Sequence, residues 1–198
     1  MGKSQNRFSR ELTVIIGVLL ITLSFSACGW GEKEREARKR VTPIYDEKGK
    51  LTVVKYDADG DGKIDTVAYM DGSRVIRIEH DRDQDGKVDR WEYYAADGRT
   101  LERVGLSTHH DGKPNRVEFY EGGRLVRTEE DTDGDGRPDK WETFDGARLA
   151  SVAFDTTHRR GKPDRRLVYG LDGAARLEVD PAGTGTFTPA AARPAAAR

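Results

Sequence analysis

The sequence predicts an all-β fold: an elongated antiparallel meander of about five to six tandem β-hairpin repeats, forming an open and curled sheet. Recurring loop glycines, tight-turn dipeptides and two-residue alternation of apolar and polar side chains together indicate this fold. The loop glycines are spaced by 24, 26, 24, 25 and 24 residues, and they are Gly62, Gly86, Gly112, Gly136, Gly161 and Gly185. A fixed period of this length indicates one supersecondary unit copied along the chain.

A second set of glycines lies between the loops and marks tight turns. The dipeptides are Lys48-Gly49, Asp71-Gly72, Asp97-Gly98, Gly122-Gly123, Asp145-Gly146 and Asp172-Gly173. Asp-Gly and Gly-Gly favour two-residue hairpins, because glycine accepts a positive φ at little cost. Each repeat is therefore predicted to be a loop, a strand, a tight turn and a second strand, with about a dozen short strands in all.

The strand that follows each loop alternates in polarity. Its fifth and seventh positions after the loop glycine are mostly apolar, namely Val67/Tyr69, Trp91/Tyr93, Val117/Phe119 and Trp141/Thr143. Its fourth and sixth positions are mostly charged, namely Thr66/Ala68, Arg90/Glu92, Arg116/Glu118 and Lys140/Glu142. We expect one apolar and one charged face. The apolar face then has to curl, pack on itself or be covered by a partner.

Two further rows align when residues are counted from the turn glycines. One row contains Val75, Leu101, Leu125 and Leu149, and the other contains Arg77, Arg103 and Arg127. Each row is predicted to be a cross-strand ladder. In a meander, all loops then lie on one edge of the sheet and all tight turns on the other.

The N-terminal 27 residues are typical of an export signal. Basic residues at Lys3, Arg7 and Arg10 precede an apolar run, and small residues precede the single cysteine, Cys28. This segment resembles a bacterial lipoprotein signal peptide, which implies a signal helix over 1–27, lipidation of Cys28 and anchoring in the membrane. Gly29 after the cysteine implies the outer membrane, at its periplasmic or surface face. The alternative is an uncleaved transmembrane anchor over 12–31, and both interpretations export the rest of the chain.

The remaining boundaries follow from composition. Residues 28–43 are predicted to be a charged tether, 44–187 the β-hairpin array with acidic loops, and 188–198 a disordered Ala/Pro/Arg tail. The 34 basic and 35 acidic residues almost cancel, so no nucleic-acid partner is expected.

Three loops repeat the pattern Asp-x-Asp-x-Asp-Gly-x-x-Asp: loop 1 (57–65), loop 2 (81–89) and loop 4 (131–139). Four carboxylates within nine residues repel one another unless a cation lies between them, and Ca²⁺ favours oxygen ligands in this spacing. About three Ca²⁺ sites are predicted. Their carboxylate ligands are Asp57, Asp59, Asp61, Asp65, Asp81, Asp83, Asp85, Asp89, Asp131, Asp133, Asp135 and Asp139. At position 7, Lys63, Lys87 and Arg137 would contribute backbone carbonyls.

These loops resemble the Ca²⁺ loop of EF-hands, and Glu92 and Glu142 occupy its twelfth position. Because the flanking segments are predicted strands, the resemblance is closer to FG-GAP and type 3 thrombospondin repeats, on hairpins similar to MORN repeats. Glu92 and Glu142 would then point to the sheet face opposite position 11. Pairing with Arg or Lys is expected for them in preference to metal binding.

Two loops lack the acidic pattern. Loop 3 (107–115) has lost carboxylates, and loop 5 is aligned as 156–164 with Arg160 at a ligand position. We expect no Ca²⁺ in loop 5 and at best a weak site in loop 3. His80, His109, His110 and His158 have no His or Cys at ligand spacing, so they are interpreted as exposed loop residues.

The chain is predicted to be a Ca²⁺-binding, lipid-anchored scaffold or binding module of the cell envelope and not an enzyme. Candidate partners are the membrane, anionic polysaccharide and another envelope protein. The alternative is a glycan-binding lipoprotein that presents an exposed aromatic strip, formed by Trp91, Tyr93, Phe119 and Trp141. A hydrolase is the least supported class, because no acid/base pair stands out from the loop carboxylates.

Overall fold

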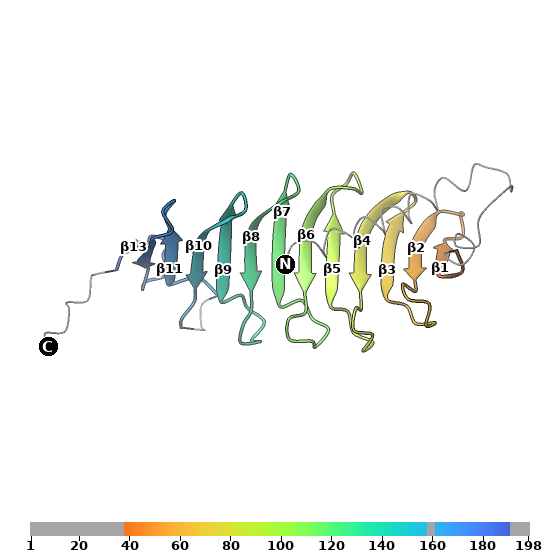
Figure 1. The fold of residues 1–198 in the computed structure, drawn as a ribbon, viewed down its shortest axis with the longest axis horizontal. Helices are drawn as coiled ribbons and strands as arrows, with labels where there is room; N and C mark the ends of the chain where they lie inside the picture. The colour runs from red at the N-terminus through yellow and green to blue at the C-terminus, as the bar shows by residue number, and fades with distance from the viewer. Residues whose placement is uncertain (1–37, 158–160, 191–198) are drawn as a thin grey trace, which may run out of the picture. The chain divides into compact units, whose positions relative to one another are not determined.

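The computed structural model describes residues 38–157 and 161–190, and its strands form one open antiparallel sheet of 13 strands in chain order (Figure 1). The strands are β1 (Val41–Tyr45), β2 (Leu51–Tyr56), β3 (Thr66–Asp71), β4 (Arg74–His80), β5 (Arg90–Tyr94), β6 (Leu101–Leu106), β7 (Arg116–Glu121), β8 (Arg124–Glu130), β9 (Lys140–Asp145), β10 (Arg148–Phe154), β11 (Arg165–Tyr169), β12 (Ala175–Val179) and β13 (Thr188–Pro189). The predicted all-β open meander is confirmed.

The chain divides into two compact units, Met1–Thr42 and Pro43–Arg198, and the sheet lies in the second unit except for the first two residues of β1. The predicted signal helix and Cys28 fall outside the described residues. Among the residues that are described, no helix has the length and apolarity needed to cross a bilayer. β1 begins inside the segment predicted as a tether, and β13 lies inside the predicted tail.

Loops and tight turns alternate between the two edges of the sheet, with the loops along the lower edge in Figure 1. The glycines at both kinds of connection adopt the left-handed backbone conformation that the sequence predicts. Gly72 and Gly146 in tight turns have φ values of 65° and 62°, and Gly62 and Gly86 in loops have 92° and 87°. Local glycine chemistry therefore fixes both edges.

Each of four successive hairpins has a bulge at the same place. The pairing register shifts between Tyr69 and Met70 in β3–β4, and equivalent shifts follow in β5–β6, β7–β8 and β9–β10. Just beyond the shift, an aliphatic residue pairs with a large side chain. These pairs are Met70 with Val75, Tyr94 with Leu101, Tyr120 with Leu125, and Phe144 with Leu149. Each member of the predicted aliphatic row therefore pairs with a large side chain in its own hairpin, and the bulges add right-handed twist.

On the face with the aromatic residues, arginines from alternate strands cover the rings. The cross-strand row runs Tyr69, Arg77, Tyr93, Arg103, Phe119, Arg127. The guanidinium carbon of Arg77 lies 4.3 Å from the centroid of Tyr69, and that of Arg127 lies 3.4 Å from that of Phe119. Each such cation–π contact contributes about 0.5–1 kcal/mol at an exposed site. The guanidiniums therefore shield rings that an open sheet would otherwise expose.

The prediction of one apolar and one charged face was wrong. On the face predicted to be charged, Ala68, Ile78, Val104 and Thr128 are at most 3% exposed, and Glu92 is also buried. The row across this face runs Ala68, Ile78, Glu92, Val104, so strands β4 and β6 place aliphatic residues beside the glutamate of β5. The polarity of a face depends on both strands of each hairpin, whereas the alternation that predicted it lies in the strand after each loop.

The hairpin at Gly98 gives a stability prediction with a built-in control. Gly98 has a φ of 65°, and a Cβ added there would lie 2.9 Å from the backbone nitrogen of Val75. Gly146 has a φ of 62° and open space around it. We expect Gly98→Ala to cost about 3 kcal/mol of unfolding free energy, and Gly146→Ala about 1 kcal/mol. Denaturant unfolding measures both, and equal costs would show that the neighbouring turn does not pack on Gly98.

Candidate metal sites on the loop edge

The loops share a backbone frame that links each one to the next. In loop 2 the amide of Asp89 donates to the carbonyl of His80 at 2.8 Å, which closes the loop, and the carbonyl of Asp89 accepts the amide of Ser107 at 2.8 Å. The same link between position 9 and the next position 1 recurs along the edge at 2.8–2.9 Å: Asp65 to Asp81, Asn115 to Asp131, Asp139 to Asp155, and Asp164 to Asp180. Neighbouring loops are therefore held in fixed register.

Within the acidic loops, backbone amides turn the carboxylates inward. The position 1 carboxylate accepts the amide of the position 6 glycine, and the pairs are Asp57–Gly62, Asp81–Gly86 and Asp131–Gly136 at 2.8–3.0 Å. The position 5 carboxylate accepts the amide of position 7, and the pairs are Asp61–Lys63, Asp85–Lys87 and Asp135–Arg137 at 2.8 Å. The residues predicted as carbonyl ligands thus also orient a carboxylate.

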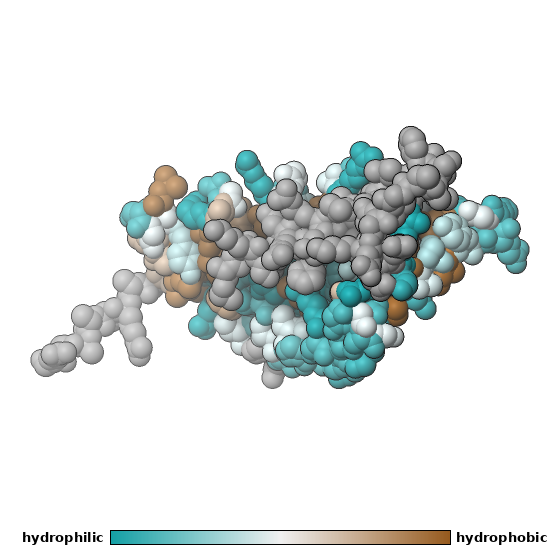
Figure 2. Space-filling view, turned by 45° about the vertical axis from the view of Figure 1, so that its right-hand side comes forward, coloured by the Kyte–Doolittle hydropathy of each residue, from teal (hydrophilic) through white to brown (hydrophobic). Residues whose placement is uncertain are grey.

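The turned carboxylates gather into three triads, within each of which the potential ligand atoms all lie within 4.8 Å of one another. The triads are Asp57, Asp59 and Asp61 in loop 1, Asp81, Asp83 and Asp85 in loop 2, and Asp131, Asp133 and Asp139 in loop 4. At position 9, Asp65 and Asp89 each accept the amide of the residue at position 2. Several groups of acids that could hold a metal ion therefore lie along one edge, and Figure 2 shows that the lowest part of the surface is largely hydrophilic.

Loop 2 contains a buried carboxylate oxygen without a partner. The Oδ1 atom of Asp81 is inaccessible to solvent and accepts no hydrogen bond. In loop 1 the equivalent oxygen of Asp57 accepts the amide of Gly60 at 2.6 Å, and in loop 4 that of Asp131 accepts the amide of Gly134 at 2.8 Å. A buried oxygen left without a donor costs about 1–3 kcal/mol. A cation among these carboxylates would satisfy it.

Glu92 and Glu142 lie on the sheet face, outside the triads. Glu142 accepts hydrogen bonds from Arg116 at 2.8 Å and Thr128 at 2.9 Å, and Glu92 accepts one from Arg90 at 2.8 Å. Burial raises the pKa of Glu142, but the hydrogen bonds from Arg116 and Thr128 outweigh it and hold that pKa below its usual value. Both glutamates are therefore engaged by cationic side chains.

Loop 3 keeps the frame with one carboxylate, that of Asp111, which accepts the amide of Lys113 at 3.0 Å. Ser107 replaces the first aspartate, and its Oγ accepts the amide of Gly112 at 3.1 Å. Asn115 replaces the last aspartate, and its side-chain oxygen accepts the amide of Thr108 at 2.7 Å. The frame therefore forms without carboxylates at positions 1 and 9.

The alignment of loop 5 from Thr156 was wrong by one residue. Asp155 occupies position 1, because its amide donates to the carbonyl of Asp139 and its Oδ2 accepts the amide of Gly161 at 2.9 Å. Loop 5 has one extra residue before the glycine, which counting back from Gly161 could not reveal. Asp155 is 2% exposed, as is Asp180, which accepts the amide of Gly185 at 2.6 Å in the last connection. The sequence interpretation missed both aspartates.

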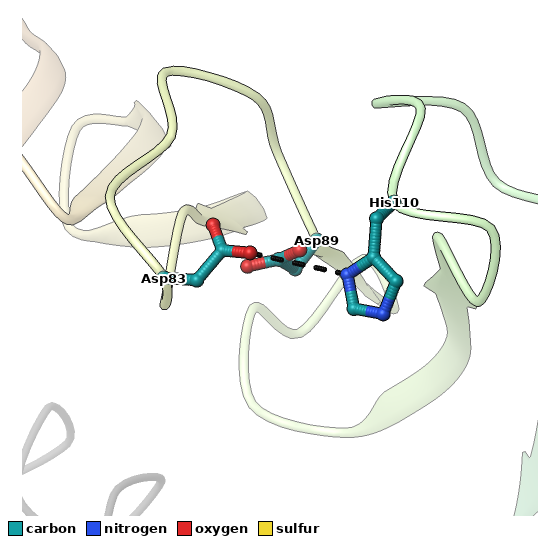
Figure 3. Close-up of side chains that lie close together, drawn as sticks. All are labelled: Asp83, Asp89 and His110. Carbon is teal, nitrogen blue, oxygen red and sulfur yellow. Dashed lines mark ion pairs between the residues drawn. The ribbon is translucent and has the colours of Figure 1, made fainter.

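His80 differs from the predicted exposed loop residue, whereas His110 is exposed as predicted but has acidic neighbours. His80 has a side chain only 14% exposed, and burial lowers its pKa to about 4. His110 lies in loop 3, where its Nδ1 is 3.9 Å from the Oδ2 of Asp83 in loop 2. Asp83, Asp89 and His110 form a fourth group whose potential ligand atoms lie within 4.8 Å of one another (Figure 3). Partners for His110 therefore do exist, but they come from the neighbouring loop.

Neither a protein-family model nor a curated protein sequence matches this chain. Among solved structures, the chain is similar to the pneumococcal O-GlcNAc transferase GtfA in complex with UDP and GlcNAc, at 17% identity and a TM-score of 0.37, over 45% of this chain and 17% of that chain. It is similar to TarM at 14% identity and a TM-score of 0.41, over 65% of this chain and 25% of that chain. The chain thus spans a quarter or less of the length of these proteins, and TM-scores this low do not establish a shared fold.

The placement of Glu142 gives a prediction that separates sheet stability from ion binding. We expect Glu142→Gln to lower the unfolding free energy by about 2 kcal/mol, because Arg116 loses one of its two charged hydrogen-bond acceptors and keeps only Glu130. Since the pKa of Glu142 is lowered in the folded protein, this difference should persist above pH 4.5 and disappear as the pH falls further.

The exposed strand-end residue Glu121 provides the control, and Glu121→Gln should change stability little. Any Ca²⁺-dependent rise in melting temperature should be the same in both variants. Loss of that rise in Glu142→Gln alone would make Glu142 a metal ligand instead.

Proposed function

We propose that this chain binds Ca²⁺ in loops 1, 2 and 4 and serves as a lipid-anchored structural scaffold or binding module of the bacterial cell envelope. The observation that carries the proposal is the recurrence of aspartate triads in three loops along one sheet edge, at positions 1, 3 and 5 of loops 1 and 2 and at positions 1, 3 and 9 of loop 4. The unpartnered buried oxygen of Asp81 supports it, because such an atom is stabilised by a cation.

The chemistry of the loops favours Ca²⁺ over other hard cations. Each triad offers three carboxylates from one glycine-containing loop, which suits the flexible, oxygen-rich coordination of Ca²⁺. Mg²⁺ requires near-ideal octahedral geometry and keeps its waters, so a set of adjacent carboxylates suits it less. Neutralising the mutual repulsion of these aspartates would make ion binding a direct contribution to folding.

The backbone links give the proposed ions a mechanical role. Because the amide of Asp81 donates to the carbonyl of Asp65, ordering loop 1 also orders the start of loop 2. An ion in one loop would therefore restrain the edge of the neighbouring hairpin. This is the action of a scaffold, and the proposal includes no catalytic step.

The glycan-binding alternative depends on an exposed aromatic strip, and three of its four rings are buried or covered by arginine. Trp91 is 8% exposed, and the guanidiniums of Arg103 and Arg127 lie over the rings of Tyr93 and Phe119. A sugar stacks on an open aromatic face, so these rings are poorly presented for it. We therefore favour the scaffold, with anionic polysaccharide or another envelope protein as its proposed partner.

Position 5 of the loops allows a matched test of Ca²⁺ binding. Millimolar Ca²⁺ should raise the melting temperature, since extracellular Ca²⁺ modules bind with dissociation constants of about 10⁻⁴–10⁻³ M. Asp61→Ala, Asp85→Ala and Asp135→Ala should each remove one site of the calorimetric stoichiometry and reduce the Ca²⁺-dependent thermal shift.

Asp111→Ala is the control, because Asp111 accepts the amide of Lys113 at 3.0 Å as its counterparts do, but its loop has Ser107 and Asn115 in place of the aspartates at positions 1 and 9. It removes the same turn hydrogen bond and should leave the stoichiometry unchanged. Equal losses in all four variants would attribute the effect to the turn, and an absence of Ca²⁺ stabilisation in the unaltered chain would refute the proposed function.

Membrane attachment is tested separately. Cys28→Ser should release the protein into the soluble fraction or leave the signal peptide uncleaved, because the proposed lipid acceptor is removed. Fractionation and intact mass measure both effects. A variant with the same membrane association and mass as the unaltered chain would contradict lipidation.

A further inference from the structure

We propose that His110 of loop 3 acts as a metal ligand across loops and completes, with Asp83 and Asp89 of loop 2, a site for a divalent transition-metal ion. The proposal rests on the proposed cation binding by loop 2 but concerns a different class of ion. It assigns a binding role to loop 3, which has lost its own acidic ligands.

The geometry leaves space for an ion between the two loops. Figure 3 shows the imidazole of His110 directed at the carboxylates of Asp83 and Asp89, with all three potential ligand atoms within 4.8 Å of one another. The 3.9 Å between Nδ1 and Oδ2 is too long for a hydrogen bond. Two ligands of one tetrahedral Zn²⁺ lie about 3.4 Å apart, so a shift of about half an ångström would complete the pair.

The reach from position 4 of one loop to positions 3 and 9 of the preceding loop occurs twice. Gln84, at position 4 of loop 2, donates from Nε2 to Asp59 and Asp65 of loop 1 at 3.0 Å each. Among the described residues, Gln84 and His110 are the non-glycine residues with positive φ, at 58° and 54°. The frame therefore directs a position 4 side chain onto the carboxylates of the preceding loop. The side chain directed onto loop 2 is the imidazole of His110.

An independent observation also indicates a missing ligand partner in loop 2. The Oδ1 of Asp81 is buried and accepts no hydrogen bond, and Asp81 shares a triad with Asp83. In loop 2, Gln84 stands where loops 1 and 4 have the glycine whose amide satisfies this oxygen. The loop that His110 faces is therefore also the loop with an unsatisfied buried oxygen.

The ligand set determines the class of ion. Two carboxylates with one imidazole suit borderline ions such as Zn²⁺, whereas oxygen-only loops suit Ca²⁺. The side chain of His110 is 72% exposed, so an ion can enter from solvent. Lys87 of loop 2 donates to the backbone carbonyl of His110 at 3.2 Å, which holds the two loops together without using the imidazole.

The experiment uses Zn²⁺ as the probe and the full chain in detergent, in buffer with and without excess Ca²⁺. Imidazole nitrogen resonances are recorded for the four histidines during the titration. We expect one Zn²⁺ per chain at this site, with the His110 resonances shifting to saturation. His110→Ala should weaken this Zn²⁺ binding at least tenfold and retain the Ca²⁺-dependent thermal shift.

His109→Ala is the matched control, because His109 is an exposed histidine in the same loop and lies outside the group. It should leave Zn²⁺ affinity unchanged. Unshifted His110 resonances, or equal losses in the two variants, would overturn the proposal while leaving the Ca²⁺ function intact. Zn²⁺ binding through His110 in a chain that Ca²⁺ does not stabilise would support this site and refute the Ca²⁺ function instead.

Discussion

The structure depends on one repeated backbone hydrogen bond, from the first amide of each loop to the carbonyl of position 9 in the loop before. It occurs between Asp65 and Asp81 and also between Asp89 and Ser107, where the receiving loop has lost its acidic pattern. Because this bond joins two backbone groups, it persists when the side chains of a loop change. The meander can therefore keep its strand register while individual loops gain or lose carboxylates.

The strand pairing therefore does not depend on which charged side chains the loops carry, in a chain with 35% charged residues. The described strands form one sheet without a second layer of described strands, and charged side chains cover part of its two faces. Arginines lie over aromatic rings on one face, and on the other Glu142 accepts from Arg116 and Thr128 beside buried aliphatic residues. The high charge content is thus used in ladders within the sheet as well as in the loops.

Strands, turns and acidic loops could be predicted from the sequence because their signals are local: a glycine needing positive φ, or alternation within one strand. Three features were beyond that reach. The buried face depends on residues such as Ile78 and Val104 that pairing brings beside Glu92. One extra residue in loop 5 hid the position 1 role of Asp155 from an alignment counted back from the loop glycine. The partners of His110 come from another repeat.

The loops are consequently not interchangeable copies. Loops 2 and 3 each reach the preceding loop through the side chain at position 4, so the ligands available at loops 1 and 2 come from two repeats instead of one. Gln84 brings an amide to the carboxylates of loop 1, whereas His110 brings an imidazole to those of loop 2. If position 4 supplies a ligand, as proposed for His110, a loop without its own acids still changes the ion preference of the loop before it. Loss of acidic residues in one repeat is then compatible with a gain of specificity in its neighbour.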